Sequence, residues 1–320
     1  MVYESFLMTV VSCLQQEFGE GYEISVRKIP KNNGVTLDGL CIHRPDFAMS
    51  PTIYMNSYYI HYQNGMTMEA IIMDILDLYY NTSLPENITQ ANLADFDYLK
   101  PRIMFKLIHA ASNKELLSKI PHIPYLDLAI IFYIHLDRSD SGQMTALICH
   151  EHLVRWNIKQ KDLWHFALMN TPYYFPGEIR SMNELMEEIA RKNLGAEYDE
   201  ETLASILEDE EQISPLYVLS NQFGLNGAGC MLYRNILKDF AELIGTDLII
   251  LPSSIHEVLI TPNHPGVSYE ELSNMVTAIN RTEVPPEDQL SNQVYLYTRA
   301  DDRIRIVSHA PELVGAAAAH

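Results

Sequence analysis

The sequence predicts an α+β protein in which a mixed, mainly antiparallel sheet carries flanking helices in two subdomains. Amphipathic helical stretches recur along the chain, short apolar runs come in hairpin pairs, and the two kinds of segment alternate irregularly. A doubly wound sheet would instead need a regular succession of strand, helix and parallel strand. The 320 residues are 47% hydrophobic and 20% charged, which provides enough apolar side chains for a full core.

The N-terminal part of the chain predicts two helices around a β-hairpin. Residues 3–18 repeat apolar side chains at helical spacing and stop at two nearby glycines, as an amphipathic helix does. Residues 22–29 and 35–42 are β-type runs on either side of an Asn-Gly turn, which predicts the hairpin. Residues 68–80 form the second predicted helix, with Thr67 as its N-cap.

Helices and strands continue to alternate through the rest of the chain. Residues 126–136 are nearly all apolar, which is typical of a strand covered on both faces. Capping boxes that begin at Ser181 and Ser268 each predict the start of a helix. The other predicted elements are helices at 113–119, 150–156, 161–169 and 229–244, strands at 102–110, 216–220, 248–251 and 258–261, and a closing hairpin of 294–298 with 304–307.

An acidic segment divides the chain. The formal net charge is −20, and residues 178–211 supply −9 of it with 12 acidic and 3 basic residues. Such a segment is either a solvated helical face or a docking surface for a basic partner. The predicted division is an N-terminal α+β subdomain at 1–177, an acidic helical connector at 178–213, a C-terminal α+β subdomain at 214–315 and an appended non-native tail at 316–320.

Charge and cysteine content limit the partners and the compartment. A surface this acidic repels phosphate backbones and anionic lipid, so we expect no direct nucleic-acid contact, no membrane binding and a basic protein partner. Cys13, Cys41, Cys149 and Cys230 match neither C-x-x-C nor zinc spacing and lie among apolar residues, which indicates buried thiols in a reducing compartment. No apolar run approaches the ~20 residues that cross a bilayer, and the N-terminal apolar stretch lacks a positive n-region, so we expect a cytoplasmic protein.

The segment most suggestive of chemistry is Leu251-Pro-Ser-Ser-Ile-His-Glu257, at the end of a predicted strand. Ser254, His256 and Glu257 are residue types of nucleophilic and general acid–base catalysis. Ser254 and Glu257 are also spaced as a capping box for one helical turn, and the members of a triad must converge from different directions. We favour the structural interpretation; in an enzyme, Asn221 is the expected oxyanion donor.

Two further segments have both a binding and a structural interpretation. Gly224, Gly227 and Gly229 lie between a predicted strand and a predicted helix, where backbone N–H groups can cradle a phosphate. Their spacing matches neither the dinucleotide fingerprint nor a P-loop, and close packing explains small residues equally well. His150 and His152 would share a metal on a strand, but on the predicted helix they diverge by about 200°. We expect no metal and no cofactor.

Residues 52–62 are rich in tyrosine, with Tyr54, Tyr58, Tyr59 and Tyr62 in eleven positions. Exposed tyrosines make good contact surfaces because they are large, rigid and amphipathic. They can equally close the rim of a core over the predicted hairpin. The sequence leaves both interpretations open.

These segments also carry a family resemblance. It rests on Pro51-Thr-Ile-Tyr-Met-Asn-Ser-Tyr-Tyr, Tyr125-Leu-Asp-Leu-Ala, Leu216-Tyr-Val-Leu-Ser-Asn221 and Leu251-Pro-Ser-Ser-Ile-His-Glu-Val258, in this order. Over nearly its whole length, the chain resembles a domain-of-unknown-function family of gut Firmicutes of the clostridial type, and the LPSSIHEV block is the most specific part. The resemblance implies a bacterial cytosolic protein of one coherent architecture, and it implies no activity, cofactor or catalytic residue.

We therefore interpret the chain as a non-enzymatic interaction module that binds a protein or peptide through an acidic, tyrosine-bearing surface. One alternative is a hydrolase-like enzyme centred on Ser254, His256 and Glu257. The other is a nucleotide-binding regulator built on the glycine loop at 224–229.

Overall fold

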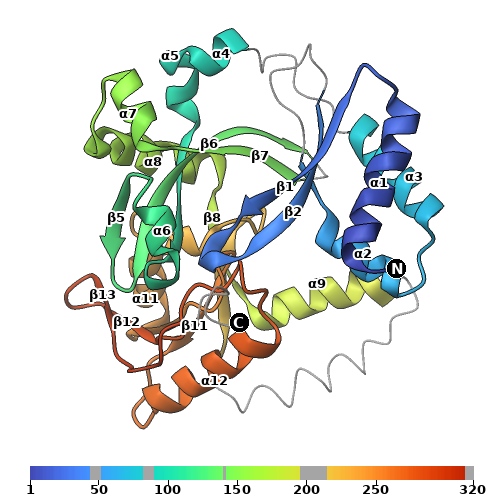
Figure 1. Cartoon of the computed structure of the whole chain (residues 1–320). Helices are drawn as coiled ribbons and strands as arrows, with labels where there is room; N and C mark the ends of the chain where they lie inside the picture. The colour runs from blue at the N-terminus through green and yellow to red at the C-terminus, as the bar shows by residue number, and fades with distance from the viewer. Residues whose placement is uncertain (44–51, 82–89, 140–141, 195–214, 314–320) are drawn as a thin grey trace. The chain divides into compact units, whose positions relative to one another are not determined.

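The computed structural model describes residues 1–43, 52–81, 90–139, 142–194 and 215–313 (Figure 1). Within these residues, three open sheets combine with helices that are interspersed between the strands along the chain. The predicted α+β class is confirmed.

The chain folds as two compact units. Unit 1 comprises Met1–Arg102 and Ile134–Leu147, and unit 2 comprises Ile103–Tyr133 and Ile148–His320. This division differs from the predicted one, which placed the boundary in the acidic segment at 178–213.

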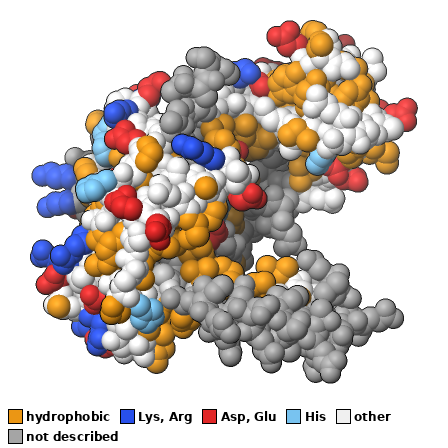
Figure 2. All heavy atoms as spheres, turned by 90° about the horizontal axis from the view of Figure 1, so that it is seen from below, with side chains coloured by type: hydrophobic (Ala, Val, Ile, Leu, Met, Phe, Trp, Pro, Cys, Tyr) orange, Lys and Arg blue, Asp and Glu red, His pale blue; other side chains and the backbone are white. Residues whose placement is uncertain are grey.

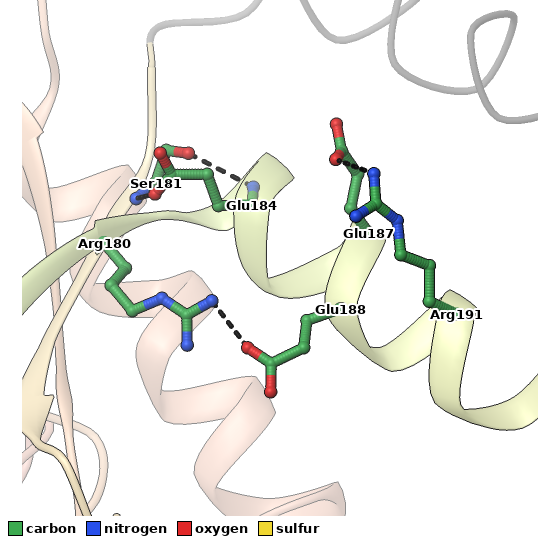
Figure 3. A network of polar contacts seen from close by, with 6 residues as sticks. All are labelled: Arg180, Ser181, Glu184, Glu187, Glu188 and Arg191. Atoms are coloured by element: carbon green, nitrogen blue, oxygen red, sulfur yellow. Dashed lines mark hydrogen bonds and ion pairs between the residues drawn. The ribbon is translucent and has the colours of Figure 1, made fainter.

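The difference arises because the start of the acidic segment and the residues that follow it belong to one sheet. β8 (Gly177–Ser181) pairs antiparallel with β9 (Tyr217–Asn221), and α9 (Met182–Leu194) follows β8 directly. The predicted capping box is present, because Glu184 N–H donates to Ser181 Oγ at 3.2 Å and Ser181 N–H donates to Glu184 Oε2 at 3.1 Å (Figure 3). The rest of the predicted connector and the whole predicted tail lie outside the described residues.

Within the described part of the acidic segment, arginines form ion pairs with nearby glutamates. Arg180 Nη2 lies 2.7 Å from Glu188 Oε2, and Arg191 Nη2 lies 3.5 Å from Glu187 Oε2 (Figure 3). On the face shown in Figure 2, Asp and Glu side chains are dispersed, whereas Lys and Arg side chains gather along one edge. The ion pairs of Arg180 with Glu188 and of Arg191 with Glu187 are what a solvated helical face is expected to show.

Unit 1 packs helices against a small antiparallel sheet. Phe6, Val10 and Leu14 of the first helix are fully buried, as their spacing predicts, together with Leu40 and Ile75. The elements are α1 (Tyr3–Phe18), β1 (Glu23–Pro30), β2 (Thr36–His43), β3 (Thr52–Tyr54), α2 (Met55–Gln63), α3 (Met68–Asn81), α4 (Gln90–Ala94), α5 (Phe96–Leu99), η2 (Lys100–Arg102) and β7 (Gly142–Leu147).

The predicted hairpin is formed by β1 and β2, whose register runs from Glu23 opposite His43 to Pro30 opposite Thr36. Its turn is η1 (Asn32–Gly34), a three-residue connection with positive φ at its Asn-Gly end, as such turns require. The sheet order is β1-β2-β3, so β1 lies at an edge. Among the described residues, the outer side of β1 has no strand neighbour.

A second sheet has the order β4-β6-β5, with β7 also paired to β6. The chain passes from unit 2 into unit 1 within β6 (Leu128–Ser139), which follows β4 (Ile103–His109) and β5 (His122–Tyr125). Every residue from Leu128 to Ile134 is buried, which confirms the predicted strand covered on both faces.

The third sheet lies in unit 2 and has the order β13-β12-β10-β11-β9-β8, with every neighbouring pair antiparallel. Its remaining strands are β10 (Leu248–Leu251), β11 (Val258–Pro262), β12 (Tyr295–Thr298) and β13 (Arg303–Ile306). The helices of unit 2, besides α9, are η3 (Ala111–Asn113), α6 (Lys114–Leu117), α7 (His150–Trp156), α8 (Gln160–Tyr174), η4 (Gly227–Leu232), α11 (Ile236–Ile244) and α12 (Tyr269–Thr282).

One helix prediction needs correction. The expected helix at 229–244 is two elements, η4 and α11, because Asn235 adopts a φ of 65° and interrupts the helical path. Ser268 caps the start of α12 as predicted, since its Oγ accepts a hydrogen bond from Glu271 N–H at 3.3 Å.

All four cysteines are free thiols; Cys230 is buried as predicted, whereas Cys13, Cys41 and Cys149 are only partly buried. Burial raises the pKa of the Cys230 thiol to about 12, which keeps it protonated and unreactive at neutral pH. Within the described residues, none of the helices combines the length and the apolar character that a bilayer crossing requires.

Candidate functional site

The segment at 252–257 connects β10 to β11 and forms a bend rather than a helical turn. Ser254 Oγ accepts a hydrogen bond from the backbone N–H of His256 at 3.0 Å, and Ser254 forms an isolated bridge with Gln289. The predicted capping box of Ser254 with Glu257 is therefore replaced by a shorter turn. In this turn the Ser254 hydroxyl accepts from the amide of His256 instead of that of Glu257. Ser254 is only 5% exposed, so its hydroxyl serves the local fold.

The ring of His256 contacts a partner through each nitrogen, and neither partner is Ser254. Nδ1 accepts from the backbone N–H of Asn226 at 3.3 Å, and Nε2 lies 3.3 Å from Asp288 Oδ1. The hydrogen bond to Asp288 raises the pKa of His256, and the charge of Glu257 acts in the same direction. These contacts link three loops and support the structural interpretation of the segment. Catalysis by Ser254, His256 and Glu257 stays a prediction.

Asn221, the predicted oxyanion donor, organises the loop that follows β9. Its Oδ1 accepts from Phe223 N–H at 3.0 Å, and its Nδ2 donates to the carbonyl of Leu225 at 2.8 Å. Asn221 is 4% exposed. The amide that an oxyanion hole would use already shapes the turn in which it lies.

The glycines of the same loop allow a close approach of two chain segments. A Cβ on Gly227 would lie 2.1 Å from Ser220 Oγ and 2.4 Å from the carbonyl oxygen of His256, so no larger residue fits without movement. The N–H groups of Gly224 and Gly229 donate to carbonyls of the loop at 3.0 and 3.2 Å. Two amides that a phosphate site would use are thus already bonded, and nucleotide binding stays a prediction.

His150 and His152 open α7, the helix that the sequence predicts. His152 Nδ1 accepts from Cys149 N–H at 2.9 Å, and its ring stacks on Trp156 with 5.2 Å between centroids. Within the part of the chain that the structure describes, no three His, Cys, Asp or Glu side chains gather as metal ligands.

The four tyrosines of the 52–62 segment lie on β3 and α2 and contact other residues of unit 1. Three of them, Tyr58, Tyr59 and Tyr62, pack against the hydrophobic core of that unit. The individual contacts are Tyr54 with Lys31, Tyr58 with Asp74, Tyr59 with the carbonyl of Met1, and Tyr62 with Phe6. This placement is that of a core rim, and a role of these tyrosines in an interface stays a prediction.

A groove that the sequence analysis did not anticipate runs along α1 beside β1. It has a volume of about 520 Å³ and lies within unit 1. Its apolar lining comes from Leu7, Met8 and Val11 on α1 and from Val26 on β1. The polar residues that complete it are Ser12, Gln15 and Gln16.

The groove exists because α1 is apolar on two faces. One face, with Phe6 and Val10, is buried in the core. Leu7 and Val11, four residues apart, pack partly against the same core and, with Met8, also line the groove. Met8 is 66% exposed. The signal in the sequence was that residues 3–18 contain more apolar side chains than one buried face requires, but a count of periodic positions does not show which of them stay uncovered.

Acidic side chains lie where the chain leaves α1 and enters β1. Glu17, Glu20 and Glu23 are exposed where α1 ends and β1 begins. Gln15 Nε2 donates to the carbonyls of Gly19 and Tyr22, which fixes the connection between the two elements. The groove therefore combines an apolar lining with an edge strand, and acidic residues lie nearby in the chain.

Residues 3–299 match a family of unknown function, DUF5688. The chain belongs to the DUF5688 family. The DUF5688 match begins at the first residue of α1 and includes the groove and both loops of unit 2 described above, which confirms the predicted membership of a family without assigned function. No curated protein and no solved structure matches the chain, so the DUF5688 family name brings no activity with it.

Proposed function

We propose that the chain is a non-enzymatic module that binds another protein through an extended peptide segment, and that the groove between α1 and β1 is the binding site. One observation carries this proposal: β1, an edge strand without a strand neighbour among the described residues, borders an apolar groove. An added strand obtains affinity from the unpaired main-chain groups of the edge and specificity from pockets for alternate side chains.

The lining of the groove defines the apolar half of the expected peptide. Alternate side chains of an extended segment point to the same side, so every second residue faces Leu7, Val11 and Val26. Branched aliphatic side chains suit these walls. Met8 adds a flexible, polarisable side chain that adapts to different partners.

The acidic residues near the groove define the charged half of the expected peptide. Glu17, Glu20 and Glu23 favour Lys or Arg at one end of the peptide. The net charge of −20 steers a basic partner in the same way, and both effects weaken as salt increases. The expected ligand is therefore an extended basic segment with alternating aliphatic residues.

Calorimetric titration with two synthetic peptides tests the proposal. Each alternates valine and serine over eight residues, and one carries two lysines at its N-terminus, the other at its C-terminus. We expect one of them to bind, and Met8→Glu to weaken that binding about tenfold, or about 1.4 kcal/mol, since the bound peptide would cover a charge in the apolar lining. Met73→Glu is the matched control, because Met73 is also 66% exposed and lies on α3.

Main-chain pairing is tested separately by N-methylation of alternate peptide residues in both registers. One register removes the donors that face β1 and should abolish binding, whereas the other should bind as before. Equal binding by both methylated peptides would contradict strand addition. A serine-directed probe separates this module from the hydrolase alternative: labelling that is lost in Ser254→Ala would favour the enzyme.

We also infer that the protein works in the cytosol of a gut Firmicutes bacterium. Four free cysteines support a reducing compartment. The LPSSIHEV block at 251–258 supports the bacterial origin. Localisation of a tagged protein by cell fractionation in a host that encodes it tests this inference.

A further inference from the structure

Unit 2 contains a cavity at the end of β4, in residues that neither the groove nor the predicted sites use. Its volume is about 560 Å³, which accommodates a small organic molecule. Residues of η3 and α6 line it, together with residues near the C-terminal end of the described chain. The apolar lining residues are Ala110, Ala111, Leu117, Pro311 and Leu313.

Side-chain amides hold the C-terminal wall of the cavity in place. Asn292 Nδ2 donates to the carbonyl of Pro311 at 3.0 Å, and Gln293 Nε2 donates to the carbonyl of Ala310 at 2.9 Å. These two lining residues therefore use their amide donors within the protein. The cavity wall is part of the ordered fold, because these hydrogen bonds hold the backbone carbonyls of Ala310 and Pro311 in place.

His109 lines this cavity and is 3% exposed. Its Nδ1 accepts from the backbone N–H of Ser112 at 3.2 Å and lies 2.9 Å from Ser112 Oγ. A neutral imidazole that accepts at Nδ1 carries its proton on Nε2. Ser112 also anchors the cavity wall, since its hydroxyl donates to the carbonyl of Leu313 at 3.1 Å.

Asp127 presents an acceptor in the same cavity. Its Oδ2 accepts from Ser291 Oγ at 2.6 Å, and its Oδ1 accepts from the hydroxyl of Tyr295. These two hydroxyls fix the orientation of the carboxylate. A carboxylate has about four lone-pair positions, so Asp127 can still accept a hydrogen bond from a ligand.

We propose that this cavity binds a small neutral molecule with an apolar body and an amide-like edge, whose carbonyl accepts from His109 Nε2 and whose N–H donates to Asp127. An amide edge places an acceptor beside a donor, which is the complement of what the two side chains offer. The apolar body fits the walls formed by Leu117 and Leu313. Amides, lactams and heterocycles with such an edge form the expected ligand class.

The electrostatics of the cavity favour a neutral ligand. An anion would lie beside the carboxylate of Asp127, and the charges of Asp127 and Glu312 together exceed that of Lys114, which also lines the cavity. A cation would be desolvated, and burial lowers the pKa of His109 even though the charges of Asp127 and Glu312 act to raise it. Burial therefore outweighs the attraction of two carboxylates for a positive charge at this position.

Protein-observed NMR titration with benzamide, benzoate and benzylamine tests the proposal, because the three probes share a ring and differ in charge. We expect benzamide to bind at least tenfold more tightly than either charged probe. Ala111→Phe should remove benzamide binding by filling the cavity, since Ala111 lines it. Ala278→Phe is the matched control, because Ala278 is exposed on α12 and lies outside the cavity.

The proposal is overturned if benzoate or benzylamine binds as tightly as benzamide, if benzamide does not bind, or if benzamide binds Ala111→Phe as well as the wild type. Should Ala111→Phe lose the native spectrum, Ala110→Phe takes its place, since Ala110 also lines the cavity. Peptide binding by unit 1 is unaffected by either variant, so the two proposals are tested independently.

Discussion

The loops at 221–229 and 252–257 in unit 2 and the α1–β1 groove in unit 1 use their side chains in opposite ways. In the unit 2 loops, Ser254, His256 and Asn221 bond to backbone or to a neighbouring side chain. In unit 1, Met8 and its neighbours on α1 line a groove that is open to solvent. Polar residues in the first region complete the fold, whereas apolar residues in the second remain available to a partner.

The contrast shows where a search by residue type goes wrong. Serine, histidine and glutamate attract attention because they can perform chemistry, yet a chain that reverses direction needs the same groups to satisfy its amides. A solvent-exposed leucine or methionine is easily overlooked in a sequence, because most apolar residues are expected to be buried. The predictions below test whether substitutions in unit 2, where side chains are packed and hydrogen-bonded, lower the free energy of unfolding more than comparable substitutions in unit 1.

The largest expected effect is at Gly227, in the centre of the unit 2 loops. Gly227→Ala places a methyl group 2.1 Å from Ser220 Oγ and 2.4 Å from the carbonyl of His256, so the two loops must separate. We expect a loss of about 3 kcal/mol in the free energy of unfolding, measured by urea denaturation. Gly21→Ala in unit 1 is the control, since a methyl group there meets nothing within 4 Å. Equal effects of the two substitutions would refute the close approach.

A Tyr→Phe pair compares the two units with the same chemical change. Tyr295 is fully buried and donates to Asp127, whereas Tyr58 donates to Asp74 at the surface of unit 1 at 2.6 Å. Tyr295→Phe should lower the free energy of unfolding by about 2 kcal/mol, because it leaves the half-buried carboxylate of Asp127 short of one donor. Tyr58→Phe should change it by about 0.5 kcal/mol or less. Thermal denaturation of both variants measures the difference, and a larger loss for Tyr58→Phe would reverse the comparison.

Local signals in the sequence predicted much of the fold. The Asn-Gly turn, the Ser181 and Ser268 caps and the buried run in β6 depend on neighbouring residues, and each forms as expected. The domain division depends on the pairing of β8, at the start of the acidic segment, with β9, which lies beyond its end. Sequence separation hides such a pairing, so the acidic segment resembled a boundary.

The candidate sites were less predictable for the same reason. Asn226 and Asp288 contact His256 from 30 and 32 positions away along the chain, and no spacing rule connects them. The cavity in unit 2 likewise brings His109 and Asp127 together with residues near 312. A sequence motif shows residue types, whereas these sites depend on which distant segments the sheets bring together.

The smallest expected effect is a difference in pH dependence between His109 and His256. Burial lowers the pKa of His109 below the ordinary 6.5, so its contribution to stability is complete above pH 6.5 and is lost as the pH falls through the folded value. The bond to Asp288 raises the pKa of His256, so its contribution is complete below pH 6.5 and is lost as the pH rises through the folded value.

Urea denaturation between about pH 5 and 8.5 separates the two histidines, because their contributions change on opposite sides of the ordinary histidine pKa. His109→Gln should flatten the rise in the free energy of unfolding on the acid side, and His256→Gln should flatten the fall on the alkaline side. Glutamine does not titrate, so each variant removes one slope and leaves the other. If both variants flattened the same side, at least one of these histidines would have a different environment, and the view that bonding in unit 2 fixes the charge state of its polar groups would fail there.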